Sequence, residues 1–279
     1  MLFVVQCFTH RQPLPITYSL LGSQTLKNQM LFQQYRPHTW DYVVGHNKTK
    51  KAILRMRDKG SLGGRAFWIS GPSGIGKTSI AYLIAGDVCD RENFIEIDAG
   101  GMTPKDIDDL EKGLRMRCLG EKSGRAVLLN EAHGLRQDSI RKLLVVLERI
   151  PAHVTYIFTT TDAGANKLFK DIDAHPLLSR CIKFDLKVED YADAMVLRAM
   201  AIAEQEGLGG ASKEEFVELA AACRFNFRDI LTEIEKGVMA REVGTLLHSV
   251  SGGDAVSSVA SDAAGMDWSS VMDQVLAGV

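Results

Sequence analysis

The feature that most constrains the fold of this chain is a glycine-rich segment at residues 71–78. Its sequence is Gly71-Pro72-Ser73-Gly74-Ile75-Gly76-Lys77-Thr78, which fits the phosphate-binding pattern G-x-x-x-x-G-K-[S/T]. The apolar run Ala66–Ile69 before it is typical of a buried strand, and residues 78–85 after it are typical of a helix. Because the pattern requires this strand–loop–helix context, it predicts a nucleotide-binding α/β domain, with a chance glycine-rich turn as the weaker alternative.

The residue types in this segment suit a triphosphate and a magnesium ion. Glycines leave room for the backbone to wrap the phosphates, while the loop N–H groups and the positive end of the following helix point at them. Lys77 is expected to reach the β- and γ-phosphates, and Thr78 to offer its hydroxyl group to Mg²⁺. We therefore predict ATP and Mg²⁺ as ligands. The predicted loop contacts are Gly71, Pro72, Ser73, Gly74, Ile75, Gly76, Lys77, Thr78 and Ser79.

The composition is that of an ordinary globular protein, with 279 residues of which 46% are hydrophobic and 24% charged. A formal net charge of −2 gives no overall basic field, so any contact with DNA must come from a local patch. The five cysteines are scattered without a C-x-x-C pair, which favours free thiols in a reducing compartment. No apolar run approaches a membrane span, and the first residues lack the basic flank of a signal peptide. These observations predict a cytoplasmic protein without a membrane partner.

Short apolar runs alternate with helical segments from residue 63 to residue 186. One helical segment carries Ile140, Leu143, Leu144 and Leu147, an i, i+3, i+4, i+7 pattern that marks one face of a helix. This alternation predicts an α/β fold with a five-stranded parallel sheet flanked by helices. The five strand candidates are Ala66–Ile69, Phe94–Ile97, Ala126–Leu129, Val154–Phe158 and Cys181–Phe184.

Three helices without an intervening strand are predicted after residue 187. The first places Tyr191, Met195 and Ile202 on one side, and the second opens with a capping-box sequence from Ser212 to Glu215. Together the helices predict a small lid domain behind the sheet domain. The third helix is predicted from apolar residues at Phe227, Ile230, Leu231, Ile234 and Val238.

The chain is expected to divide into four segments. These are an N-terminal extension at 1–29, an ATPase domain at 30–187, a helical lid at 188–245 and a tail at 246–279 rich in Ser, Gly and Ala. The extension is either a loosely ordered arm or the result of a misassigned start, with Met30 as the true initiator. The tail is predicted to be a flexible linker that ends either in a frayed segment or in a short docking helix.

A second motif follows the third strand candidate, where Asn130 and Glu131 end the apolar run Ala126–Leu129. Glu131 is placed to polarise the attacking water as a general base; the alternative is a solvated acid after a strand. An Asp is expected at the position of Asn130. An Asn side chain can hold a Mg²⁺-bound water through its carbonyl oxygen but brings no charge, so weaker metal binding and slow turnover are predicted.

Three more polar residues extend this constellation. Thr161, at the end of the next strand, is expected to hold the lytic water or sense the γ-phosphate, unless it is an ordinary strand residue. Arg180, at the entry to the last strand, is either a surface residue or an arginine finger that acts on a neighbouring subunit's phosphates. Arg228, in the last lid helix, either reaches the γ-phosphate from the lid or lies on the surface near a helix cap.

In their order and spacing these motifs resemble AAA+ ATPases, and more narrowly DNA polymerase clamp-loader subunits of the bacterial gamma/tau and replication factor C small-subunit type. The resemblance covers about residues 31–245, and Ser179-Arg180-Cys181 is its most specific element. The stretches that carry it are Tyr35-Arg36-Pro37, Val43–His46, the glycine-rich loop, Leu129–His133, Thr160–Asp162, Ser179–Cys181 and Asn226–Arg228.

The resemblance implies a mechanism and a set of partners. The adenine would lie near Tyr35, Arg36, Pro37 and Val44. Subunits would form an open ring with ATP between neighbours, and the ATP-bound state would grip a sliding clamp and primed DNA. Hydrolysis, with Arg180 of one subunit acting on the ATP of the next, would release both. Candidate DNA-facing residues are Arg136, Arg141 and Lys142. Lys105, Arg115 and Arg117 form a second candidate group, with a solvated helical face as the alternative because acidic residues are interleaved with them.

The sequence departs from the family at Asn130, in lacking the zinc-binding cysteines of the bacterial subunit, and in having a low-complexity tail where a helical collar is expected. Because the resemblance implies that the collar holds the ring together, the missing collar bears on ring assembly. Two other functions are therefore retained as alternatives. One is a different AAA+ DNA-remodelling ATPase, such as a helicase loader or a branch-migration motor. The other is an ATP-binding module with little hydrolysis.

Overall fold

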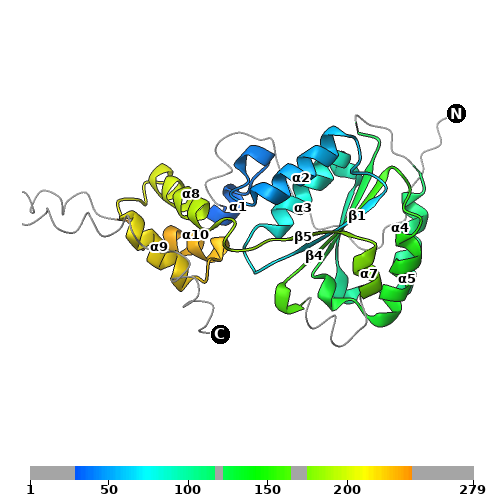
Figure 1. The fold of residues 1–279 in the computed structure, drawn as a ribbon. Coiled ribbons are helices and arrows are strands. Elements are labelled where there is room, and N and C mark those ends of the chain that lie inside the picture. Colours follow the sequence, from blue (N-terminus) through cyan, green and yellow to red (C-terminus); the bar gives the residue numbers. More distant parts are fainter. Residues whose placement is uncertain (1–28, 117–121, 165–174, 241–279) are drawn as a thin grey trace, which may run out of the picture.

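The computed structural model describes residues 29–116, 122–164 and 175–240. They form a sheet domain and a smaller group of helices, joined by the segment that follows the last strand (Figure 1). The predicted extension and tail lie largely outside the described residues. No helix in the described part of the chain combines the length and apolar character that a membrane crossing needs.

The sheet has five parallel strands in the order β2-β3-β4-β1-β5. This confirms the predicted fold class, and each observed strand differs from its predicted range by one or two residues at its ends. All five carboxyl ends meet at one edge of the sheet, because the strands are parallel. The strands are β1 (Arg65–Ser70), β2 (Phe94–Asp98), β3 (Arg125–Asn130), β4 (Val154–Thr160) and β5 (Ile182–Asp185).

Helices cover both faces of the sheet, which explains why its central strands are apolar throughout (Figure 1). Phe67 of β1 packs with Ile84 on the face of α2 and α3, and Trp68 packs with Leu143 on the face of α4, α5 and α7. Burying each such side chain contributes about 1.5–3 kcal/mol to folding. The helices are α2 (Asn47–Asp58), α3 (Lys77–Val88), α4 (Pro104–Leu114), α5 (Gln137–Leu147) and α7 (His175–Ser179).

The second group consists of α8 (Ala192–Gln205), α9 (Lys213–Ala222) and α10 (Phe227–Glu235). The predicted capping box is present, since Ser212 Oγ accepts from Glu215 N–H and the Glu215 carboxylate accepts from Ser212 N–H at 2.6 Å. The expectation that Val238 extends the third helix was wrong. Gly237, with a φ of 83°, follows the end of α10, and Val238 is 55% exposed.

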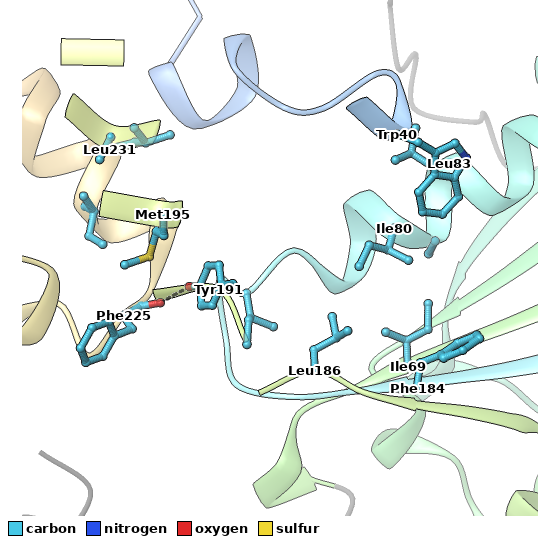
Figure 2. Close-up of a cluster of buried hydrophobic side chains, with 14 of the residues drawn as sticks. Trp40, Ile69, Ile80, Leu83, Phe184, Leu186, Tyr191, Met195, Phe225 and Leu231 are labelled. Carbon is cyan, nitrogen blue, oxygen red and sulfur yellow. Dashed lines mark hydrogen bonds between the residues drawn. The ribbon is translucent and has the colours of Figure 1, made fainter. Parts of the chain in front are cut away.

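One continuous apolar cluster joins the lid helices to the sheet domain. Figure 2 shows Tyr191 between the side chains of Met195 and Leu231 on the lid side and Leu186 and Ile80 on the sheet side. The Tyr191 hydroxyl donates to the carbonyl of Phe225, which ties the start of α8 to the turn before α10. The lid therefore packs against the sheet domain through Tyr191, the residue that precedes α8.

The short helix α1 (Leu31–Gln34) packs against α10, although some 200 residues separate them. The N–H of Leu31 donates to Glu235 at 3.4 Å, and Gln34 Nε2 donates to Glu206 at 2.9 Å. The start of the described chain is thus fixed to the lid as well as to the sheet domain. This places the opening segment over the carboxyl edge of the sheet, where the predicted site lies.

Candidate nucleotide-binding site

A pocket lies at the carboxyl edge of the sheet, between the glycine-rich loop, the ends of β3 and β4, the opening segment and the lid. Most of the predicted site residues line it. They are Tyr35, Arg36, Pro37, Val44, Ser73, Gly74, Ile75, Gly76, Lys77, Thr78, Ser79, Glu131, Thr161 and Arg228. Gly71, Pro72, Asn130 and Arg180 do not line it.

The loop at residues 71–76 keeps a shape that only glycine tolerates at two of its turns. Gly74 and Gly76 have φ values of 73° and 100°, in the left-handed region. A Cβ atom on Gly74 would lie 1.6 Å from Oδ1 of Asn226, so the loop backbone is in direct contact with the start of α10. The loop and the lid therefore constrain each other's positions.

Lys77 is buried at the start of α3, and its ammonium group is held by the loop. Nζ donates to the carbonyl oxygens of Gly71 at 2.8 Å and Pro72 at 2.6 Å. Gly71 and Pro72 therefore contribute to the site through the carbonyl groups that hold Lys77, although neither residue lines the pocket. Burial lowers the pKa of Lys77, while the charges of Glu131 and Asp162 oppose that shift. Lys77 thus lies within electrostatic reach of Glu131, which lines the pocket, and of Asp162, which does not.

Thr78 is half-buried in the pocket wall, and the described residues offer its hydroxyl no hydrogen-bond partner. Mg²⁺ in nucleotide sites typically takes one or two protein ligands and completes its shell with phosphate oxygens and water. A single free hydroxyl beside the phosphate loop fits that requirement. Among the described residues, no group of three or more His, Cys, Asp or Glu side chains forms a metal cage independent of a nucleotide.

Asn130 is engaged within the sheet. Its Nδ2 donates to the carboxylate of Glu96 on β2, and its Oδ1 accepts from Thr159 on β4 at 2.8 Å. Glu96 also accepts from the hydroxyl of Tyr82 on α3 at 2.7 Å. The side chain predicted to support a metal therefore has both ends of its amide occupied, and its metal role stays a prediction.

Glu131 adopts a left-handed conformation, with φ 52° and ψ 48°, directly after β3. Non-glycine residues in this region cost about 1–3 kcal/mol and occur disproportionately at functional sites. The carboxylate reaches the pocket and lies 3.2 Å from Nδ1 of His133. The hydroxyl of Thr161, at the end of β4, accepts from the N–H of Gly164 at 3.1 Å. Both side chains therefore stand at the pocket on short turns that leave parallel strands.

Arg228 reaches the pocket from the first turn of α10. Asn226 caps that helix by accepting from the N–H of Arg228 at 3.1 Å, and the guanidinium lies 5.4 Å from the ring centroid of Phe32. The positive charge of Arg228 contributes to lowering the pKa of Lys77 across the pocket. The lid thus contributes one cation to the same cavity as the loop.

The opening segment forms the other wall. Tyr35 donates its hydroxyl to Glu206 of the lid, and Arg198 lies over the rings of Tyr35 and Tyr42 at 5.7 Å and 6.0 Å. Burial and the bond to Glu206 raise the pKa of Tyr35 to about 12. This wall of aromatic and aliphatic groups suits the flat face of a nucleobase.

Several lining residues were absent from the predicted set. They are Phe32, Tyr42, Val43, His46, Ile80, Tyr191, Arg198, Phe227 and Leu231. Most are apolar or aromatic side chains whose periodicity marks them equally well as core residues. Val43 and His46 stand in the opening segment that the resemblance placed near the base, so proximity in sequence could have found them. The sequence around Arg198 does not predict a place in the pocket, because this follows only from how α8 packs against the opening segment.

Arg180 lies away from this pocket. Its Nη2 pairs with Glu148 at 2.5 Å and its Nη1 donates to the carbonyl of Pro176 at 2.9 Å, while its Nε has no hydrogen-bond partner among the described residues. The side chain is 30% exposed. The structure thus separates this arginine from the pocket of its own chain.

Comparison with known proteins gives a consistent result. Residues 67–186 match the model of the ATPase family associated with various cellular activities (AAA). DNA polymerase III subunit tau of Salmonella typhimurium is 33% identical over 186 residues, which cover 58% of this chain and 27% of that protein. Replication factor C small subunit of Natronomonas pharaonis is 29% identical over 185 residues, which cover 64% of this chain and 54% of that protein.

Among solved structures, the RuvB Holliday junction branch migration motor of Thermotoga maritima aligns with a TM-score of 0.55 and 18% identity, covering 76% of this chain and 70% of that one. At this identity the likeness concerns the fold alone. The chain spans between about a quarter and about half of the length of the two relatives named above.

Proposed function

We propose that this chain, whose residues 67–186 are an AAA ATPase domain, is a clamp-loader-like subunit that binds and hydrolyses ATP to place a sliding clamp on primed DNA. The observation that carries the proposal is the convergence of Lys77, Thr78, Glu131, Thr161 and Arg228 on one pocket. They come from the loop, two strand ends and the lid. The homology to subunits of DNA polymerase III and replication factor C supplies the replication setting.

Nucleotide binding would use the loop as a cradle. The loop N–H groups and the start of α3 face the phosphates, and Lys77 exchanges its bonds to the carbonyls of Gly71 and Pro72 for phosphate oxygens. Thr78 would hold Mg²⁺, which neutralises charge on the phosphates when bound. The base would lie against Tyr35, Arg36, Pro37 and Val44. The bond of Tyr35 to Glu206 lets the same wall respond to the position of the lid.

Hydrolysis would require the polar residues at the strand ends. The oxygen of a water molecule attacks the γ-phosphorus as the bond to the bridging oxygen of ADP breaks, and Glu131 takes the proton that the water loses. Thr161 would orient that water. Arg228 would contact the γ-phosphate from α10, so that loss of phosphate changes the contacts that hold the lid.

The partners would be other clamp-loader subunits, a sliding clamp and primed DNA, in the cytoplasm. Arg180 supports an assembly because it lies outside its own pocket, and it would exchange its bonds to Glu148 and Pro176 for a neighbour's γ-phosphate. Arg136, just before α5, and Arg141 on α5 are exposed and support a DNA-facing role, whereas Lys142 pairs with Asp108. We propose residues 30–187 as the ATPase domain and 188–245 as the lid.

ATP turnover measured with and without primed DNA and clamp tests the proposal. We expect stimulation by the two ligands together, loss of ATP binding in Lys77→Ala, and retained binding with turnover reduced about 100-fold or more in Glu131→Gln. Lys51→Ala, on the exposed face of α2, is the matched control for Lys77. Turnover that ignores both DNA and clamp would argue against a clamp-loading role.

A further inference from the structure

We propose that His133 is a positioning residue for the proposed general base, holding the carboxylate of Glu131 at the pocket through its Nδ1–H group. The inference rests on the proposed ATP hydrolysis. It states that the imidazole of His133 sets the orientation of the general base, Glu131. It is carried by the surroundings of His133, which lies in the turn Ala132–Gly134 that follows β3 and contacts β4.

The backbone position of Glu131 does not by itself fix the orientation of its carboxylate, so another residue has to do so. Glu131 has a left-handed backbone, and its side chain is 55% exposed. A carboxylate so placed has many accessible rotamers, and a general base displaced by about 1 Å loses roughly two orders of magnitude in rate. Nδ1 of His133 lies 3.2 Å from Oε2 of Glu131. Lys77 also acts on Glu131 electrostatically, but it is committed to the loop carbonyls.

The hydrogen bonds around Thr160 decide which nitrogen of His133 carries the proton. Thr160 Oγ1 lies 3.3 Å from Nδ1 of His133 and donates its own proton to the carbonyl of Thr161 at 3.2 Å. With its own proton on that carbonyl, the hydroxyl oxygen accepts, and this arrangement assigns the proton of the imidazole to Nδ1. The same Nδ1–H group lies 3.2 Å from the Glu131 carboxylate, so Thr160 and Glu131 share it, whereas an unprotonated Nδ1 would direct a lone pair at both oxygens.

The imidazole is also confined on its other side. A Cβ atom on Gly164 would lie 2.5 Å from Cγ and Nδ1 of His133, so the turn after β4 packs directly on the ring. Gly164 also donates its N–H to Thr161. One short turn thus fixes His133 and Thr161 together, and through His133 it reaches Glu131.

Three substitutions separate hydrogen bonding from packing. His133→Phe keeps a ring without a donor, His133→Asn keeps a donor near the position of Nδ1 without the ring, and His133→Ala removes both. His153→Ala is the control, because His153 lies at the opposite edge of the sheet, just before β4, and its Nε2 contacts the carbonyl of Leu114 at 2.9 Å. Thermal unfolding confirms which variants are folded.

We expect His133→Phe and His133→Ala to lower kcat by about tenfold to 100-fold while the Kd for ATP stays within about twofold. His133→Asn should recover most of the loss. If the Phe variant matches the wild type, or if the Asn variant is as impaired as the Ala variant, the ring acts by packing alone and the inference is overturned.

A measurement without turnover keeps this test independent of the proposed function. In protein labelled with ¹⁵N-histidine, the ring nitrogens of His133, assigned by comparison with His133→Asn, should show a protonated Nδ1 and an unprotonated Nε2 at pH 8. An Nε2–H tautomer would refute the inference whatever the enzyme does. A wild-type protein with the expected tautomer but no ATP turnover would instead count against the proposed function.

Discussion

At the scale of single residues, Asn130 shows how one substitution changes a local network. A carboxylate at this position would lie against Glu96, which already accepts hydrogen bonds from Asn130 and Tyr82. The amide instead donates to Glu96 and accepts from Thr159. The neutral amide of Asn130 can therefore donate a hydrogen bond where a carboxylate would repel Glu96. Any effect of Asn130 on metal binding depends on this contact with Glu96.

We predict that Asn130→Asp alone lowers the free energy of unfolding by about 1–3 kcal/mol, because two carboxylates would meet and one pKa would have to rise. Urea unfolding at pH 7.5 measures the loss. The double variant Glu96→Gln/Asn130→Asp restores the pairing and should recover most of the stability. Full stability of the single variant would show that the two side chains do not share this contact.

His46 gives a prediction for pH dependence. It is 3% exposed, its ring stacks on Tyr191 at 5.0 Å, and its Nε2 lies 3.2 Å from the carbonyl of Ile75 in the loop. Burial lowers its pKa from 6.5, and the carbonyl of Ile75 and the charge of Asp190 oppose that shift only in part. The folded state therefore holds this imidazole neutral.

Below about pH 6.5 the unfolded chain binds a proton that the folded chain resists, so stability falls as the pH drops through that value. The slope from one group is at most about 1.4 kcal/mol per pH unit. His46→Gln should reduce the loss of stability between pH 7 and pH 5.5, as measured by urea unfolding. An identical pH dependence in the variant and the wild type would contradict a neutral buried His46.

At the scale of elements, the contact between the loop and α10 would couple the proposed nucleotide binding to the lid. Gly74 is the point of contact, because Asn226 occupies the space that a side chain there would need. Arg228 and the cap of α10 lie on the same turn. The proposed coupling therefore needs no intermediate residue between the loop and the first turn of α10.

Gly74→Ala should weaken ATP binding and destabilise the protein by about 1–3 kcal/mol, through both its φ of 73° and the clash with Asn226. A double-mutant cycle with Asn226→Gly separates the two causes. In the Asn226→Gly background the alanine should cost at least about 0.5 kcal/mol less. If the two stability changes are additive, the cost of the alanine comes from the loop backbone alone and not from contact with Asn226 of the lid.

At the scale of the whole molecule, most residues of the proposed ATPase site line one pocket, but Arg180 lies outside it. The arginine is paired with Glu148 at the end of α5 and with the carbonyl of Pro176. An arginine that serves a neighbouring subunit has to stand on the surface in this way. The proposed assembly thus predicts that defects in Lys77 and Arg180 complement each other between subunits.

Arg180→Ala should abolish DNA-stimulated turnover with ATP affinity unchanged, whereas Lys77→Ala should lose ATP binding. Mixing the two inactive proteins should restore part of the turnover, because some interfaces would combine an intact Lys77 with an intact Arg180. Turnover in the mixture, compared with each protein alone at the same total concentration, is the measurement. No recovery in a mixture shown to co-assemble would rule out a shared site.

The sequence by itself determined the order and approximate limits of the five strands and the presence of three lid helices, as well as the residues at the strand ends. Strand and helix periods are local, and the glycine-rich loop carries its own backbone requirements. Since parallel strands bring their carboxyl ends to one edge, Glu131 and Thr161 could be placed beside Lys77 from the order of the motifs. The end of α10 was misjudged at Val238, because apolar spacing continues past the glycine that stops the helix.

Only the tertiary structure decided which side chains meet across those elements. The contacts of Asn130 with Glu96, of Tyr35 with Glu206, of Arg180 with Glu148 and of Gly74 with Asn226 join segments that are far apart in the chain. Such contacts depend on strand order, register and the packing angle of the lid, and no local period encodes these. The contact between His133 and Glu131 is close in sequence, yet its direction was fixed by Thr160 and Gly164 from the neighbouring strand end.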